Sequence, residues 1–115
     1  MRILIVLLSS SLILSMAACS ASRKMASTNL NQVNVLVQQA EQSPAQEFAS
    51  VDLYNAKEKY QKAKSEYDKE NYDQANLLIE EVKVDLDYAM AKGKLEKVKN
   101  FSSEPNTPSE KVNLE

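Results

Sequence analysis

The sequence has 115 residues and a nearly balanced charge, with 14 Lys and Arg against 16 Asp and Glu and a formal net charge of −2 at pH 7. A chain of this length forms one small domain, and its weakly acidic character argues against a nucleic-acid partner, because the phosphate backbone attracts basic surfaces. The absence of His removes the commonest general base and metal ligand, so we expect no enzyme activity, no metal and no cofactor, and the single Cys excludes an internal disulfide.

The N-terminal segment has the pattern of a bacterial export signal. Arg2 precedes a mainly apolar stretch, and small residues then lead to the cysteine in the sequence Met16-Ala17-Ala18-Cys19. These four residues resemble the lipobox of bacterial lipoproteins, in which an aliphatic residue and two small residues precede the cysteine that receives a diacylglyceryl group; Met16 stands where Leu is usual. The transfer needs a thiolate nucleophile, which Cys19 supplies. We therefore predict a lipoprotein signal peptide over residues 1–18 and lipid attachment at Cys19.

Two alternatives for this segment are an uncleaved membrane anchor and an ordinary signal peptide. Three serines, Ser9, Ser10 and Ser11, interrupt the apolar stretch, which falls short of the roughly 20 apolar residues that span a bilayer. This favours the lipoprotein, whose palmitate and diacylglyceryl chains would add about 0.8 kcal/mol of membrane affinity per buried methylene. The resemblance also implies a location. In Gram-negative lipoproteins an Asp after the cysteine favours the inner membrane, so Ser20 indicates the periplasmic face of the outer membrane.

Composition divides the remaining chain into three parts. Residues 19–28 are small and polar without apolar periodicity, which is typical of a flexible tether. Residues 29–100 contain one Gly and one Pro and are rich in Ala, Leu, Lys, Glu and Gln, so we predict a helical domain. Residues 101–115 are polar and contain two Pro, which predicts a disordered tail.

Within the helical domain, the apolar spacing predicts a first, shorter helix over residues 29–42. One face of it carries Leu30, Val33, Val37 and Ala40, with Leu36 beside them. A second helix over residues 44–69 is predicted to begin in the sequence Ser43-Pro44-Ala45-Gln46. There Ser43 suits the N-cap, Pro44 suits the first helical position and Gln46 completes a capping box.

The second helix and a third over residues 72–99 are predicted to form an antiparallel hairpin. Each has apolar or small residues at intervals of three and four, which indicates one buried face. These residues are Leu53, Ala56, Tyr60, Ala63 and Tyr67 in the second helix and Ala75, Ile79, Val82, Leu86, Ala89 and Gly93 in the third. The turn lies at residues 69–71, and Asn71 with Gln74 can cap the third helix.

Folding the chain back at this turn fixes a register between the two helices. The register places Tyr67 beside Tyr72. It also places Asp52 opposite Asp85 and Lys57 opposite Lys83, and like charges across a seam destabilise a helix pair. Either the register differs by some residues or these groups turn into solvent.

The third helix has a second apolar line, Leu77, Val84 and Tyr88, that the hairpin face does not use. We expect the first helix to cover this line, which gives an all-α, coiled-coil-like domain of three helices. In the rival interpretation, the same three residues are an exposed partner surface. Charges on this helix run from acidic to basic, from Asp73, Glu80, Glu81 and Asp85 to Lys92, Lys94, Lys97 and Lys99. The gradient suits the helix dipole and needs no further function.

Several short motifs resemble those of small envelope lipoproteins that carry domain of unknown function 4398. They are Gln38-Gln39-Ala40, Ser43-Pro44-Ala45-Gln46-Glu47-Phe48, Glu70-Asn71-Tyr72-Asp73-Gln74-Ala75 and Tyr88-Ala89-Met90-Ala91-Lys92. The likeness covers residues 30–97 in addition to the lipobox. At the turn, Glu70 and Asn71 stand where the family has Gly and Asp. The resemblance implies an exported helical hairpin whose biochemical role is not established.

Two functions fit these features. The first is a membrane-anchored periplasmic lipoprotein with a structural or adaptor role, which presents its hairpin to another envelope protein or to a second copy of itself. The second is an envelope binding module that holds a peptide or lipid between its helices. The acylated Cys19 would join either protein to the membrane, and Leu77, Val84 and Tyr88 are the candidate partner surface.

Overall fold

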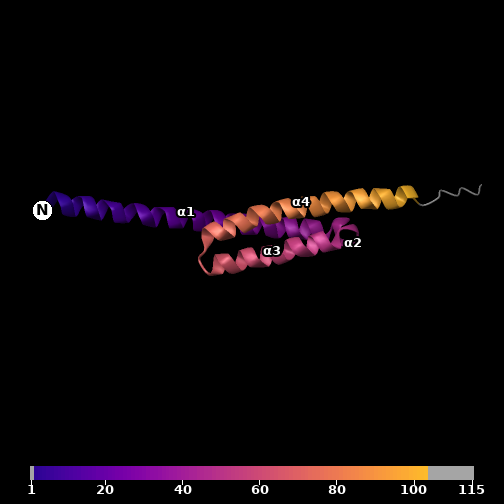
Figure 1. The fold of residues 1–115 in the computed structure, drawn as a ribbon, viewed down its shortest axis with the longest axis horizontal. Helices are drawn as coiled ribbons and strands as arrows, with labels where there is room; N and C mark the ends of the chain where they lie inside the picture. The colour runs from indigo at the N-terminus through magenta and orange to yellow at the C-terminus, as the bar shows by residue number, and fades with distance from the viewer. Residues whose placement is uncertain (1, 104–115) are drawn as a thin grey trace, which may run out of the picture.

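The structure, a computed structural model, describes the backbone of residues 2–103 and the side chains of residues 20–103. It contains four helices: α1 (Arg2–Glu41), α2 (Ala45–Phe48), α3 (Ser50–Asp68) and α4 (Tyr72–Ser103). Helices α3 and α4 form an antiparallel hairpin, and the second half of α1 lies along it (Figure 1). The fold is elongated, with extents of 111 × 21 × 16 Å. The expected all-α hairpin with an N-terminal helix is confirmed.

Helix α1 is much longer than the predicted helix over residues 29–42, because residues 19–28 are helical and do not form the predicted tether. Long-range contacts explain the difference. Ala26 is fully buried, and Ser22 Oγ donates a hydrogen bond to Asp73 Oδ1 of α4 at 3.0 Å. The Asn76 side-chain amide also donates to the Ser22 carbonyl at 3.4 Å. Small residues without Gly or Pro permit the helix, and α4 holds it in place.

The predicted second helix over residues 44–69 is interrupted in the structure. Ser43 Oγ accepts a hydrogen bond from the Ala45 N–H at 3.1 Å, which is the contact expected of a capping residue. Pro44 has helical backbone angles, φ −56° and ψ −15°. The helix then breaks at Ala49, where φ is −141° and ψ is 36°. Both Ala45 and Ala49 are buried, so the break lets two consecutive segments face the core.

The turn between α3 and α4 lies at residues 69–71, as predicted, and has the hydrogen bonds of a Schellman motif. The Asn71 N–H donates to the Glu66 carbonyl and the Glu70 N–H to the Tyr67 carbonyl, both at 2.9 Å. Glu70 is left-handed, with φ 64°. The Asn71 amide donates to Glu66 Oε2 at 2.8 Å. This bond and the Lys69 ammonium lower the pKa of the Glu66 carboxyl below its usual 4.5.

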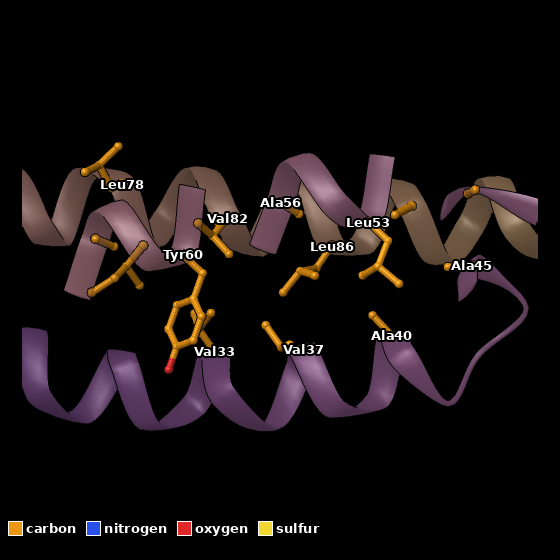
Figure 2. Close-up of a cluster of buried hydrophobic side chains, with 14 residues drawn as sticks. Val33, Val37, Ala40, Ala45, Leu53, Ala56, Tyr60, Leu78, Val82 and Leu86 are labelled. Atoms are coloured by element: carbon orange, nitrogen blue, oxygen red, sulfur yellow. The ribbon is translucent and has the colours of Figure 1, made fainter. Parts of the chain in front are cut away.

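The core is a seam of small residues with a few larger ones between them (Figure 2). The predicted faces are buried on all three long helices except at Leu30 and Tyr67, which are half-buried. The largest side chains that are fully covered are Ile79, Leu86, Val33 and Val82. Leu78 and Asn76 are buried as well, although the sequence did not mark them. Small residues let the helix axes approach closely. In such a close-packed seam, adding or removing a single methylene changes the stability.

The structure keeps the predicted register of the hairpin, since Lys59 Nζ lies 3.1 Å from Glu81 Oε2 and Gly93 packs against Ala45, but the flanking charges turn toward opposite charges. Asp52 lies beside Lys92, with Oδ2 and Nζ 2.7 Å apart, and does not face Asp85. Asp85 instead accepts from Lys59 at 2.7 Å. Lys57 pairs with Glu41 of α1 and does not face Lys83. Opposite charges therefore meet where the sequence register had placed like charges. The expected neighbours Tyr67 and Tyr72 do meet, with ring centroids 5.4 Å apart.

Helix α4 continues past the predicted end at residue 99 to Ser103. The first three residues of the predicted tail, 101–103, are therefore helical. The rest of that tail, residues 104–115, lies outside the described residues.

Candidate functional site: the exposed face of α4

The predicted partner residues lie on the side of α4 that faces away from the other helices. Leu77, Val84 and Tyr88 are 62%, 67% and 56% exposed. The expectation that the first helix covers this line is therefore wrong. Helix α1 packs instead against the core faces of α3 and α4 through Val33, Val37 and Ala40, as Figure 2 shows. One face of α4 thus serves both neighbouring helices and leaves the opposite face open.

The exposed line continues toward the C-terminus, which the sequence interpretation missed. Ala91, Leu95 and Val98 are also exposed, the last two by 55% and 62%. We call the six residues Leu77, Val84, Tyr88, Ala91, Leu95 and Val98 the α4 stripe. With Glu81 filling the gap after Leu77, its positions alternate by four and three residues. This is the spacing of a coiled-coil seam. The signal was present in the sequence as the interval of seven from Leu77 to Val84, Ala91 and Val98.

The stripe is about 32 Å long, because its ends are 21 residues apart at 1.5 Å per residue. Leu95 and Val98 follow Gly93, and this last part of α4 extends beyond α2 (Figure 1). After Gly93, no described residue of α4 is buried. The end of α4 shares a pocket with α2, which Glu47 and Phe48 line together with Asn100, Phe101 and Ser103. A partner on the open face would therefore cover the stripe.

Gly93 marks the point where the bundle ends on α4. A Cβ at this position would lie 2.6 Å from the Ala45 Cα and 2.8 Å from the Pro44 carbonyl carbon, and it would also meet the Ala45 nitrogen. No side chain fits between these backbones. The only Gly of the chain thus allows α2 to close against α4.

Charged residues flank the α4 stripe, and most of them have partners in the same chain. Lys83 pairs with Glu80 and Lys99 with Glu96, at 2.7 and 2.8 Å. The hydrogen bond to Asp52 raises the pKa of the Lys92 ammonium above its usual 10.5. Asp87 and Lys94 differ, because they are exposed and take part in no ion pair with another described residue. They are therefore free to bind opposite charges on a partner.

The predicted lipid attachment residue, Cys19, belongs to α1, and its side chain lies outside the described part of the structure. The first described contact between this end of α1 and α4 is that of Ser22 with Asp73. Among the described residues, no helix combines the length and the apolar character that a membrane crossing requires. The same residues hold no group of three or more acidic, Cys or His side chains placed to bind a metal ion.

A second candidate site is a groove of about 550 Å³ between α1 and α3. It is lined by Ser27, Leu30, Asn31, Tyr60, Gln61, Lys64, Ser65, Tyr67 and Asp68. The Tyr60 hydroxyl donates to the Leu30 carbonyl at 3.4 Å, and Lys64 Nζ lies 5.0 Å from the centre of the Tyr60 ring. At the end of the groove, a hydrogen bond to Tyr67 raises the pKa of the Arg23 guanidinium above its usual value. The groove thus combines aromatic faces with charges of both signs, from Lys64 and Asp68.

Comparison with known proteins gives one match. No curated protein and no solved structure matches the sequence. The family model described as "Domain of unknown function (DUF4398)" matches residues 28–102, which include the helical bundle and the entire α4 stripe. The chain therefore belongs to the DUF4398 family.

Proposed function

We propose that the protein is a lipid-anchored lipoprotein of the periplasmic side of the outer membrane, with a structural or adaptor role. It presents the hairpin of α3 and α4 to another protein, which binds the α4 stripe. The observation that carries this proposal is the exposure of Leu77, Val84 and Tyr88 in one line with coiled-coil spacing. An apolar line of this length on a small monomer is a common mark of a protein-binding surface.

The anchor in this proposal rests on the lipobox. Acylation at Cys19 would attach the chain three residues before Ser22, where α1 makes its first described contact with α4. The proposal assigns no catalytic step, and it fits a sequence that has no His.

Labelling with a radioactive fatty acid tests the anchor. The native protein should incorporate the label, and a Cys19→Ala variant should not, because the thiol is the acceptor. A Ser20→Ala variant, which keeps the thiol, is the matched control and should label like the native chain. Equal labelling of the native chain and Cys19→Ala would refute the anchor.

Photo-crosslinking in living cells tests the partner surface. A photoreactive amino acid at Leu77, Val84 or Tyr88 should give a discrete protein adduct, because these side chains lie in the proposed interface. Glu58 and Lys62 are exposed on α3 and serve as controls. A pattern shared by stripe and control positions, or no adduct from the stripe, would contradict the proposed function.

The groove between α1 and α3 supports the second candidate, a module that binds a peptide or lipid. Its tyrosine rings and the Lys64 and Asp68 side chains offer apolar faces and charges of both signs to a peptide or a lipid. In this case, native mass spectrometry of the protein purified from membranes should find a bound molecule that is lost in a Lys64→Glu variant. A protein that carries no such molecule would exclude this candidate.

A further inference from the structure

The α4 stripe faces away from the bundle, and we propose that a second copy of this chain binds it, with the two α4 helices antiparallel. The inference rests on the proposed function in one respect only, that the α4 stripe is a protein-binding surface. It does not depend on the lipid. The argument uses the spacing of the stripe, the charges beside it and the length of helix that extends beyond the bundle.

The four central residues of the α4 stripe, Val84, Tyr88, Ala91 and Leu95, match one another when one helix is reversed, whereas Val98 and Leu77 then lie opposite Glu81 and Ser102 of the second copy. The seam of a coiled coil has two kinds of position, called a and d. In an antiparallel pair, each layer joins an a position of one helix to a d position of the other. Alignment of Tyr88 with Ala91 of the second copy also aligns Val84 with Leu95 of the second copy. Each pairing occurs twice by symmetry, which gives four consecutive apolar layers. A large side chain meets a smaller one in each layer, as close packing requires.

The unpaired charges support the same register. Asp87 and Lys94 lie on the same edge of the α4 stripe, seven residues and about 10.5 Å apart along the axis, too far for a pair within one chain. In the antiparallel register, Asp87 lies beside Lys94 of the second copy, and Lys94 lies beside Asp87 of the second copy. Two ion pairs thus form from residues that have no such partner among the described residues of their own chain.

A parallel pair of α4 helices fits less well. It places each residue of the seam against its own copy, so that Glu81 meets Glu81. On the flanks, residue 80 faces residue 85 and residue 94 faces residue 99, which are acid against acid and Lys against Lys, and only residue 87 faces an opposite charge, at residue 92. Like charges at these positions destabilise a coiled coil. The acidic-to-basic gradient along α4 therefore favours the antiparallel arrangement.

The extended end of α4 gives an independent reason for a second copy. The helix after Gly93 has no buried residue among those described, and it carries Leu95 and Val98. In the antiparallel pair this end lies against the first half of the other α4 helix, which is supported by its own bundle. Each bundle thus covers exposed apolar residues at the end of the other α4 helix.

The arrangement also places the two chains relative to a membrane. Ser22 contacts the first turn of α4, so the start of the mature chain lies near Tyr72. In an antiparallel pair the two Tyr72 ends point in opposite directions. Both anchors can enter one leaflet only when the pair lies along the membrane surface.

Thiol cross-linking of the full-length chain tests the inference. Val84→Cys and Leu95→Cys are placed in two chains with different tags, which are expressed together, and membranes are treated with a short bis-maleimide. The antiparallel pair should give a cross-link between the two tags. Each variant expressed alone should give none, because the two copies of residue 84 lie about 16 Å apart along the axis. The unsubstituted chain measures any reaction of Cys19.

The charges give a second readout in the same assay. Asp87→Lys in both chains should lower the yield of the mixed cross-link roughly fivefold, because two like-charge contacts replace two ion pairs. Asp87→Lys in one chain and Lys94→Asp in the other should restore the yield, since opposite charges meet again. Glu58→Lys in both chains, which is exposed on α3, is the control and should leave the yield unchanged.

Three results would overturn the inference: cross-links within each single variant, which indicate a parallel pair; no cross-link at all; or a yield that does not respond to the charge exchange. If photo-crosslinking from the α4 stripe still captures a different protein, the proposed function stands and only the second copy is excluded. If both assays give nothing from the stripe, the proposed function fails as well.

Discussion

Gly93 shows how one residue fixes the approach of two helices. Replacement by Ala places a methyl group within 2.6 Å of the Ala45 Cα, so the backbones must move apart. We expect Gly93→Ala to lower the free energy of unfolding by about 1–3 kcal/mol, despite a gain in helix propensity of up to about 1 kcal/mol.

Chemical denaturation followed by circular dichroism measures the effect of Gly93→Ala. Lys97→Ala, at an exposed position on the same helix, is the control and should change the stability by less than about 0.5 kcal/mol. A Gly93→Ala protein as stable as the native chain would show that α2 does not close on α4 as described.

Glu70 occupies the left-handed position of the turn, with φ 64°, where glycine has no steric penalty. We expect Glu70→Gly to raise the free energy of unfolding by about 0.5–1 kcal/mol, because relief of the strain exceeds the added entropy of the unfolded chain. Lys69→Gly is the matched control, since Lys69 has φ −82°, and it should destabilise. Equal effects of both substitutions in denaturation experiments would argue against the Schellman geometry.

Tyr60 makes the stability depend on pH in the alkaline range. Burial raises the pKa of its phenol above the usual 10.0, so the folded state holds the proton more tightly than the unfolded state. Below pH 10 the phenol is neutral in both states and has no effect. Above this value the unfolded state ionises first, so the stability falls as pH rises through the raised pKa of the folded state.

The comparison with Tyr60→Phe isolates this contribution. The free energy of unfolding of the variant should fall less at alkaline pH than that of the native chain. Relative to the native chain, the variant should therefore become more stable between neutral pH and about pH 11. Other ionisable groups are present in both proteins, such as Lys59, whose pKa is raised by Asp85 and Glu81. Their contributions to the pH dependence of stability therefore cancel in the comparison. Parallel loss of stability in the two proteins would contradict the assignment.

At the scale of the elements, α1 differs most from its sequence-based description. Residues 22–28 are docked against α4 through Ser22 and the buried Ala26. We therefore expect the amide of Ala26 to exchange with solvent as slowly as that of Val33, because both sit in the same packed helix. Hydrogen exchange followed by mass spectrometry measures this, with the exposed turn at Glu70 as the fast control. Fast exchange throughout residues 22–28 would indicate the tether after all.

Local periodicity explains what the sequence could predict. The buried faces of α3 and α4 and the turn were predicted, because intervals of three and four residues define one side of a helix whatever lies beside it. The helical state of residues 19–28 could not be predicted, since it depends on Ser22 meeting Asp73, 51 positions away. The break at Ala49 likewise follows from close contact between α2 and α4 at Gly93.

The candidate site was predicted in part for the same reason. Periodicity identified Leu77, Val84 and Tyr88 as a separate apolar line, but it could not show which helix covers the line. The core of α4 faces α1 and α3 together, so no helix remained for the opposite side. The continuation to Ala91, Leu95 and Val98 required knowing that the bundle ends at Gly93, beyond which α4 residues are exposed.

At the scale of the whole molecule, the protein is a rod with one apolar line along it. Half of the buried hydrophobic residues are alanines, which contribute little area per residue, so stability depends on the close approach of the helices. The exposed line lies opposite this seam on α4, which contacts each of the other three described helices. A partner helix on this line can therefore pack against α4 without disturbing the packing of α1, α3 and α4 on one another.

The docking of Ser22 on α4 has a consequence for how tightly any partner must bind. With Cys19 acylated as proposed, only Ser20 and Ala21 separate the lipid from Ser22, which contacts the bundle, so the rod loses most of its freedom to rotate. Chains confined to a surface in this way have lost much of their translational and rotational entropy before they associate, and their effective concentration is high. A stripe of few apolar side chains can then suffice at the membrane, although the same contact would be weak between free chains in solution.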